Sequence, residues 1–336
     1  MSQTDTTIEP LIAALVARIE PRAELISARI LSGGTSQDSW LIETRLGKRP
    51  HDFVLRRAPG GDGEKRDDAI GLDAEAEVIR AAGKNGVPVP GIVTRLRPED
   101  GLGTGFVMNR VLGETVARKI FRAEDLAAIR PRLAHLCGEA LARISQVPLD
   151  AIPSLETWDA ARRLADARAL HARQGLTRPA IDYTLNWLEE RLPADQPRPR
   201  LVHGDFRNGN LMINADGVGA VLDWEIAHFG SPIEDLGWFC VPSWRFGRLD
   251  DVAGGFGPVE DLLAGYEAGG GPPVDRIELH FWTVLGTLMW GQVCIRTAFE
   301  FRNERFAIEP AVIGRRLSEV ELDLMMLTGA RDGELL

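Results

Sequence analysis

The hydrophobic pattern of the chain changes near residue 110, and this change limits the folds that are open to it. Before that point, short strand-like stretches occur at residues 28–32, 40–44, 52–56 and 106–111. Helical spacing of apolar residues predicts helices over 6–19 and 73–82 in the same part. Beyond it, helical spacing dominates, over residues 124–146, 155–173, 178–192, 258–268 and 275–299. The sequence therefore predicts a small sheet-bearing domain with an N-terminal helix, residues 1–110, followed by a mostly helical domain, residues 111–336.

Length and charge narrow the class of protein further. At about 150 residues per domain, 336 residues correspond to about two domains. Such a chain can bury a sizeable core without disulfides or a structural metal. The 39 basic and 49 acidic residues give a net charge of −10. An acidic chain is a poor partner for nucleic acid, because neutralising phosphates needs a basic face.

The cysteines and the apolar stretches indicate where the protein functions. Cys137, Cys240 and Cys294 are far apart and odd in number, and they form no C-x-x-C pair. This spacing excludes a disulfide framework and does not suit a zinc site. No apolar run is long enough to span a bilayer, and residues 1–10 lack a signal-peptide pattern. We expect a cytoplasmic, reduced protein with neither a membrane nor a nucleic-acid partner.

The most informative segment is a short β-like insert in the helical part. Strand-like stretches at 201–203, 211–213 and 218–222 alternate with loops that carry Asp205, Asn210 and Asp223. These three oxygen-bearing side chains therefore lie at the ends of short neighbouring strands. Mg²⁺ prefers a few such oxygen ligands, completed by water and phosphate oxygens.

The spacing of these residues is that of a phosphoryl-transfer site. In the kinase pattern H-x-D-x-x-x-x-N, followed by a strand-delivered Asp, the first Asp accepts the acceptor proton, and the Asn and the second Asp hold the metal. Here the motif reads His-Gly-Asp instead of His-Arg-Asp, and Leu-Asp-Trp-Glu replaces Asp-Phe-Gly. The competing interpretation is a polar loop with an Asx turn at each carboxylate. The strand context at both places favours phosphoryl transfer.

With these residues the sequence resembles the aminoglycoside phosphotransferase and choline kinase superfamily, and within it the group that contains the kinase-like domain of certain acyl-CoA dehydrogenases. The resemblance rests on residues 203–212, 222–225 and 230–237, and it extends over about 25–294. It implies an α+β, two-lobed protein-kinase-like fold that binds a nucleotide between its lobes. The small N-terminal lobe would hold an antiparallel sheet and one main helix, and the larger C-terminal lobe would be mostly helical.

The resemblance also implies roles for residues in the small lobe. A loop formed by Gly33, Gly34, Thr35 and Ser36 would approach the nucleotide phosphates. A Gly-Gly hairpin turn explains the same residues, and Gln37 stands where the family usually has Asn. Arg56 would contact the phosphates in place of the usual Lys. Its helix partner would be Glu75, with Glu77 as the competing candidate.

The remaining expected roles concern the base and the catalytic loop. Backbone groups of the hinge residues Met108, Asn109 and Val111 would bind the purine edge, and Met212 and Leu222 would lie under the base. Asp205 would be the catalytic base, with Asn210 and Asp223 as metal ligands. His203 would position the loop and Asp235 would brace it through backbone hydrogen bonds. Arg207 would reach phosphate or acceptor, or else form a surface salt bridge.

The acceptor is much less constrained by the sequence. Aromatic residues gather in the second part of the chain: Trp238, Phe239, Trp244, Phe246, Trp282 and Trp290. They would form a cage for a quaternary ammonium group or, as buried aromatics usually do, simply pack the core. Four acidic residues would receive a polycationic acceptor or form a solvated face: Glu234, Asp250, Asp251 and Asp261.

The sequence thus predicts a Mg²⁺-dependent small-molecule kinase that transfers the γ-phosphoryl group of ATP or GTP to a hydroxyl of an unidentified acceptor. A protein kinase is disfavoured, because no Ala-Pro-Glu segment follows Asp223. Two alternatives stay open: a catalytically silent nucleotide-binding regulatory module of the same fold, and a metal-dependent hydrolase that uses the same carboxylates. The sequence does not specify the oligomeric state.

Overall fold

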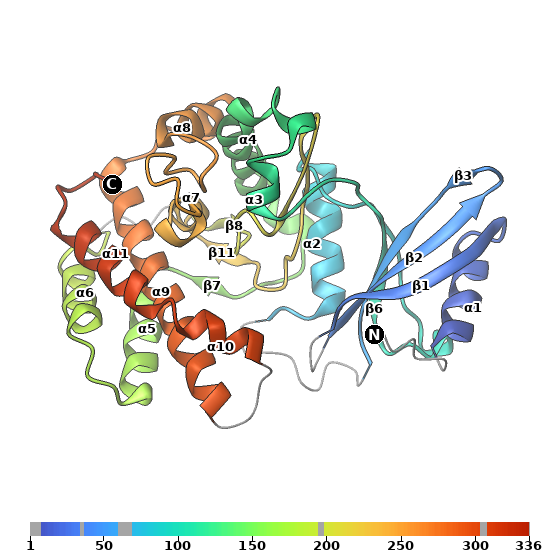
Figure 1. Ribbon diagram of the computed structural model, residues 1–336, viewed down its shortest axis with the longest axis horizontal. Coiled ribbons are helices and arrows are strands. Elements are labelled where there is room, and N and C mark those ends of the chain that lie inside the picture. The colour runs from blue at the N-terminus through green and yellow to red at the C-terminus, as the bar shows by residue number, and fades with distance from the viewer. Residues whose placement is uncertain (1–7, 34–36, 60–68, 194–197, 303–307, 336) are drawn as a thin grey trace. The chain divides into compact units, whose positions relative to one another are not determined.

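The computed structural model describes residues 8–33, 37–59, 69–193, 198–302 and 308–335 (Figure 1). The chain forms two compact units. The first comprises Met1–Gly113 together with two later segments, Val147–Leu155 and Gly219–Ala227. The second comprises Glu114–Gln146, Glu156–Val218 and His228–Leu336. Asp223 therefore belongs to the first unit and Asp205 to the second, although they lie only 18 residues apart in sequence.

The first unit is built on an antiparallel sheet. Its path runs β1-β2-β4-β6-β5, and the short β3 pairs with β2. The strands are β1 (Ala23–Gly33), β2 (Asp38–Leu46), β3 (Arg49–Pro50), β4 (Phe53–Ala58), β5 (Ile92–Arg95) and β6 (Thr104–Asn109). Two helices accompany them, α1 (Glu9–Ile19) and α2 (Leu72–Lys84). The predicted strand at 28–32 is the second half of the longer β1, and the sequence missed β5, which has only four residues.

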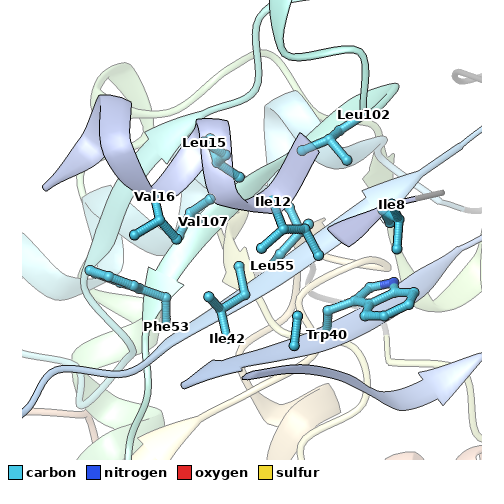
Figure 2. Close-up of a cluster of buried hydrophobic side chains, with 11 residues drawn as sticks. Ile8, Ile12, Leu15, Val16, Trp40, Ile42, Phe53, Leu55, Leu102 and Val107 are labelled. Carbon is cyan, nitrogen blue, oxygen red and sulfur yellow. The ribbon is translucent and has the colours of Figure 1, made fainter. Parts of the chain in front are cut away.

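The alternation of β4 decides which side chains face the core and which face the site. Phe53 and Leu55 point to the apolar cluster under α1, where they meet Ile12, Leu15 and Trp40 (Figure 2). The α1 residues recur at helical spacing and so lie on one face of that helix. Because successive strand residues point to opposite faces, Arg56 lies on the other face of β4. There it meets α2, which places Glu75 against it.

The second unit is mostly helical. Its helices are α3 (Ala117–Ile120), α4 (Leu133–Ser145), α5 (Ala160–Gln174), α6 (Pro179–Glu190), α7 (Ile233–Phe239), α8 (Val259–Ala268), α9 (Arg276–Arg302), α10 (Ile308–Gly314) and α11 (Leu317–Gly329). The middle of helix α9 has apolar residues on all sides, which allows α5, α6, α7, α10 and α11 to pack against it. No helix in the described parts of the chain is long and apolar enough to cross a membrane.

Short strands carry the site of the second unit. β7 (Thr157–Trp158), β11 (His228–Gly230) and β8 (Arg200–Val202) form a three-stranded sheet in that order. β9 (Leu211–Asn214) pairs with β10 (Gly217–Val221), whose first residues belong to the same unit.

Two predicted helices begin later than their apolar spacing suggests. The segment predicted as a helix over 124–146 contains two short 3-10 turns, and α4 begins only at Leu133, after Pro131. Proline has no N–H to donate within a helix and so favours a helix start. The helix predicted from residue 155 begins at Ala160, where the Asp159 side chain caps it by accepting from the Arg162 amide. The α+β class predicted from the sequence is confirmed.

Candidate functional site

The first unit gathers three carboxylates around Arg56. Its Nε lies 3.2 Å from Oε2 of Glu75 on α2. Its Nη2 lies 3.0 Å from Oδ1 of Asp223 and 3.0 Å from Oε2 of Glu225. Of the two candidate helix partners, the structure therefore places Glu75 against Arg56, whereas Glu77 pairs with Arg80 at 2.7 Å. We call Arg56, Glu75, Asp223 and Glu225 the Arg56 cluster.

The Arg56 cluster carries more negative than positive charge. Burial raises the pKa of Glu75 to about 7, against the opposing effect of the Arg56 charge. Burial alone would lower the pKa of Arg56, but the charges of Glu75, Asp223 and Glu225 outweigh burial and raise that pKa. One guanidinium thus faces three carboxylates, of which Glu75 alone is fully buried. The excess negative charge suits a cation or a cation-bearing ligand.

Asp223 has an unusual backbone. Its φ of 65° lies in the left-handed region, which few residues other than glycine adopt. Its segment is held in the first unit by two backbone hydrogen bonds, from the Ile70 amide to the Glu225 carbonyl and from the Val221 amide to the Pro88 carbonyl. Strained backbone of this kind is typical of functional sites. Asp223 Oδ1 lies near Arg56 but outside hydrogen-bond geometry and accepts no hydrogen bond among the described residues.

Of the predicted hinge residues, Met108 and Asn109 are the last two of β6, and Val111 comes shortly after the strand in the same unit. The Asn109 amide donates to the Gly91 carbonyl and the Arg110 amide to the Asp52 carbonyl. Val111 has the first backbone amide after β6 that has no partner within the described residues. Met108 and Leu222 are each half-buried, as a surface that meets a planar base requires. The hydrogen-bonding edge of a purine would accept from the backbone amide of Val111.

The predicted phosphate loop lies largely outside the described residues. Gly33 ends β1 and pairs with Asp38, the first residue of β2. Gly34, Thr35 and Ser36 are not among the described residues, so the loop remains a prediction.

The second unit holds the predicted catalytic loop through its backbone. After β8, the amides of His203 and Gly204 donate to the two carboxylate oxygens of Asp235, at 2.7 and 2.9 Å. Gly204 has a φ of 86°, so a side chain at this turn would be strained. Burial raises the pKa of Asp235 to about 7, against the two amide hydrogen bonds. His203 is fully buried, and its Nδ1 accepts from the Asp205 amide at 3.1 Å.

Three donors fix the carboxylate of Asp205. Arg207 Nε lies 3.0 Å from Oδ1, and Asn210 Nδ2 lies 2.7 Å from Oδ2. The third donor is the indole Nε1 of Trp238, at 2.9 Å from Oδ1. This role of Trp238 was not predicted from the sequence. Its only sequence signal is its place three residues after Asp235 on a helix, which puts both side chains on one face.

Arg207 also packs against the aromatic ring of Trp244. Its guanidinium carbon lies 5.2 Å above the ring of Trp244, a cation–π distance, and its side chain is 31% exposed. Trp244 and Trp282 are buried in the core, whereas Trp238 and Trp290 are half-buried. In β9, Met212 is half-buried and Leu211 is fully buried.

The acidic residues considered for a polycationic acceptor do not form one surface. Glu234 is buried and bound to Arg163 Nε at 2.9 Å, so it is not available to an acceptor. Asp251 pairs with Arg248. The structure therefore gives no support to an acidic acceptor face made by these residues.

The described side chains supply only some of the ligands that a divalent cation such as Mg²⁺ requires. Among the described residues, no group of three or more His, Cys, Asp or Glu side chains could hold a metal by itself. Asn210 uses its amide nitrogen on Asp205, which leaves its oxygen as the ligand atom. Asp223 has an unsatisfied carboxylate oxygen in an electronegative cluster. Each of these oxygens, taken on its own unit, is of the type that Mg²⁺ binds together with water and phosphate oxygens.

Comparison with known proteins places this site in a family. The family model described as "Phosphotransferase enzyme family" matches residues 27–277. Acyl-CoA dehydrogenase family member 10 of Mus musculus is 30% identical over 272 residues, which cover 72% of this chain but only 24% of that protein. The match thus spans about a quarter of the length of this curated relative.

Solved structures show the same fold. A suspected aminoglycoside phosphotransferase from Ralstonia eutropha has a TM-score of 0.75 at 20% identity, with 95% of this chain and 98% of that chain covered. A thermostable mutant of an aminoglycoside phosphotransferase, in a ternary complex with AMP-PNP and hygromycin B, has a TM-score of 0.60 at 15% identity. That comparison covers 96% of this chain and 99% of the other. The chain has the two-lobed, kinase-like α+β fold and belongs to the phosphotransferase enzyme family.

Proposed function

We propose that this protein is a Mg²⁺-dependent kinase that transfers the γ-phosphoryl group of ATP or GTP to a hydroxyl of a small-molecule acceptor. The observation that carries the proposal is the preorganised carboxylate of Asp205, held by Arg207, Asn210 and Trp238. A base fixed in this way loses little entropy when it meets the acceptor. The fold relative bound to AMP-PNP and hygromycin B supports a nucleotide and a hydroxyl-bearing acceptor as the substrates.

The proposed transfer replaces one phosphorus–oxygen bond by another. The acceptor oxygen forms a bond to the γ-phosphorus, and the bond from that phosphorus to the bridging oxygen breaks, with its electron pair leaving on the nucleoside diphosphate. The acceptor proton goes to the carboxylate of Asp205. Arg56 binds phosphate oxygens, and the backbone at Val111 meets the base. Asn210 and Asp223 would hold Mg²⁺, which supplies charge neutralisation at the phosphates.

A catalytically silent nucleotide-binding module is the second candidate. One observation favours it: the guanidinium of Arg56 is engaged by three carboxylates of its own unit instead of being free for phosphate. In that case the nucleotide would bind and stabilise the fold without being consumed. Against it stands the complete set of Asp205, Asn210 and Asp223.

Nucleoside diphosphate release tests the proposal. The wild type is incubated with Mg²⁺ and ATP or GTP in the presence of aminoglycosides, choline, ethanolamine, sugars, homoserine or hydroxyacyl thioesters. Acceptor-dependent release supports the kinase, whereas nucleotide-induced thermal stabilisation without any release supports the silent module. A metal-dependent hydrolase would show no nucleotide binding.

Asp205→Asn is the matched variant for this assay. It keeps the shape of the side chain but removes the base, so transfer should fall about 10²–10⁴-fold. Nucleotide-induced stabilisation should persist, because the proposed nucleotide contacts lie elsewhere. Transfer by Asp205→Asn at the wild-type rate would refute the assignment of the base.

A further inference from the structure

Helix α7 contacts the catalytic loop at two positions. Asp235 binds the loop backbone at His203 and Gly204, and Trp238 binds the Asp205 carboxylate itself. The two residues are three positions apart, so both side chains leave the same face of the helix. One short helix therefore holds both the path of the loop and the orientation of its carboxylate.

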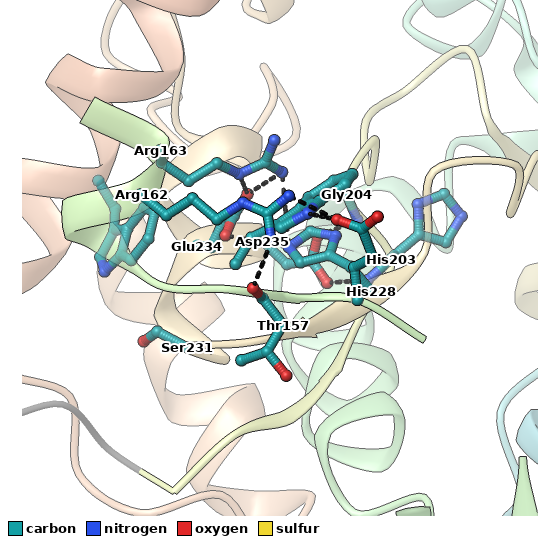
Figure 3. A network of polar contacts seen from close by, with 12 residues as sticks. Thr157, Arg162, Arg163, His203, Gly204, His228, Ser231, Glu234 and Asp235 are labelled. Atoms are coloured by element: carbon teal, nitrogen blue, oxygen red, sulfur yellow. Dashed lines mark hydrogen bonds and ion pairs between the residues drawn. The ribbon is translucent and has the colours of Figure 1, made fainter. Parts of the chain in front are cut away.

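Helix α7 is itself held firmly. Glu234 forms an ion pair with Arg163 of α5 and accepts from His228 Nε2 of β11 at 3.2 Å (Figure 3). On its other side α7 packs closely on α9, since a Cβ at Gly237 would lie 2.5 Å from Cβ of Trp282. The helix thus has little freedom to shift relative to the loop it contacts.

The ring of Trp238 is confined as well. A Cβ at Gly286 of α9 would lie 3.2 Å from Cε3 of Trp238, so the glycine makes room for the indole. Trp238 also lies against Trp244, with ring centroids 5.3 Å apart. A rigid ring with a single N–H donor presents that donor in one direction only.

The hydrogen bond is specific to Trp238 within this aromatic group. The indole nitrogens of Trp244 and Trp290 are buried and have no partner within the described residues. Trp244 and Trp290 pack with centroids 4.8 Å apart, so they share the surroundings but not the contact. The neutral indole N–H stabilises the charged carboxylate without competing with it for the acceptor proton.

We infer that Trp238 is a positioning residue that fixes the orientation of the Asp205 carboxylate through its indole N–H. This inference rests on the proposed function for its kinetic consequence but not for the hydrogen bond itself. Oδ1 is then held from two directions, by Arg207 and Trp238, while Asn210 holds Oδ2. With both oxygens held, rotation of the carboxylate away from the acceptor is opposed.

The hydrogen bond is tested first, by NMR of the indole N–H groups in the ¹⁵N-labelled full chain. The chain has 8 tryptophans, and the Trp238 resonance is assigned by its loss in Trp238→Phe. We expect this one resonance to move upfield in Asp205→Ala, which removes its acceptor. Asp205→Asn, which keeps the shape of the side chain, should move it less. A Trp238 resonance that is unchanged in both variants overturns the inference.

The kinetic consequence is tested with Mg²⁺-ATP and water as the probe acceptor, yielding ADP and phosphate. Trp238→Phe should lower kcat about tenfold, in the range that misplaced catalytic groups cost, and leave the KM for ATP unchanged. Trp187→Phe is the matched control, because it makes the same substitution at a buried site on α6. Its kcat should equal that of the wild type.

The outcomes separate the inference from the proposed function. Equal kcat values for Trp238→Phe and Trp187→Phe would overturn the inference, as would an equal rise in the KM for ATP in both. A wild type that neither binds nor turns over ATP or GTP would overturn the proposed function. The NMR result for Trp238 would then still decide the hydrogen bond.

Discussion

Two arginines, one in each unit, bind carboxylates in opposite ways. Arg163 in the second unit meets one glutamate, Glu234, and its guanidinium carbon lies 4.3 Å from the centroid of the Trp158 ring. Arg56 in the first unit meets three carboxylates. The first group is balanced in charge and nearly closed to solvent, whereas the second has excess negative charge and is partly open.

The pKa values express this difference. Burial alone would raise the pKa of Glu234, but the Arg163 charge and the contact with His228 lower it to about 2. The pKa of Glu75 instead rises to about 7, because burial outweighs its attraction to an arginine that it shares. An ion pair whose charges cancel stabilises the fold, whereas a cluster with excess charge attracts a ligand of opposite charge. The comparison therefore favours a supporting role for α5 and α7, and it is the basis on which we propose the Arg56 cluster as the binding group.

The largest expected effect is that of Arg163→Met on stability. The substitution leaves the buried Glu234 without its cation, which typically costs about 3–5 kcal/mol of unfolding free energy. Chemical denaturation measures the loss. Arg162→Met is the matched control, since the neighbouring Arg162 pairs with Glu156 and both side chains are exposed, at 47% and 63%. It should change stability by at most about 1 kcal/mol. Similar losses in the two variants would show that the Arg163 pair is not structural.

The Arg163 pair also predicts a pH dependence. Because the folded pKa of Glu234 lies below its ordinary value of 4.5, its contribution to stability is present above that pH. It is lost as the pH falls from about 4.5 toward 2. Arg163→Met should remove this acid-side slope, and Arg162→Met should keep it.

The second-largest expected effect is that of Glu75→Gln on the pH dependence of stability. The contribution of Glu75 has the opposite sign to that of Glu234. The folded pKa of Glu75 lies above its ordinary value of 4.5, so the folded state binds more protons between pH 4.5 and 7. Stability from this group therefore falls as the pH rises through that window, by up to about 3 kcal/mol. Glu75→Gln should flatten this part of the stability curve. Asp235 has a shift in the same direction but is present in both proteins, so it cancels in the comparison.

The third effect is that of Arg56→Met on nucleotide binding. Losing hydrogen bonds from a charged donor costs about 1.5–3 kcal/mol, which corresponds to a 10–100-fold weaker Kd for the nucleotide that stabilises the wild type. Isothermal titration calorimetry with the nucleotide, in the presence of Mg²⁺, measures this Kd. Arg95→Met is the control, because Arg95 also lies on the sheet and pairs with α2, at 3.7 Å from Asp73. An unchanged Kd in Arg56→Met would remove the Arg56 cluster from the proposed nucleotide site.

The sequence predicted those parts of the site that are set by local spacing. Asp205 and Asn210 lie five residues apart between two short strands, so spacing alone points to them, whereas Arg56 came from the family resemblance. The same resemblance pointed to Glu75 as the partner of Arg56 and kept Glu77 as the competing candidate. Strand pairing and helix packing made that choice, because only Glu75 is buried toward β4.

The contacts that support the site could not be predicted from the sequence. Trp238 meets Asp205 across 33 residues, and Arg163 meets Glu234 across 71. No local pattern encodes such pairs, since an arginine on α5 reads as a solvated charge until the fold buries it. The strands β7 and β11 were missed because two or three residues carry no period. Helix α7 was missed for a similar reason, as its seven residues make barely two turns.

The smallest expected effect is that of Glu77→Gln, and it bears directly on the choice between Glu75 and Glu77. Glu77 pairs with Arg80 on the surface of α2, with side chains 38% and 31% exposed. Exposed pairs on a helix contribute about 0.3–0.5 kcal/mol, so the loss of stability should not exceed that. Nucleotide-induced stabilisation should be unchanged, because Arg56 keeps Glu75. If Glu77→Gln weakened nucleotide binding, a carboxylate outside the Arg56 cluster would contribute to that binding, and charge excess in the cluster would no longer identify the binding group.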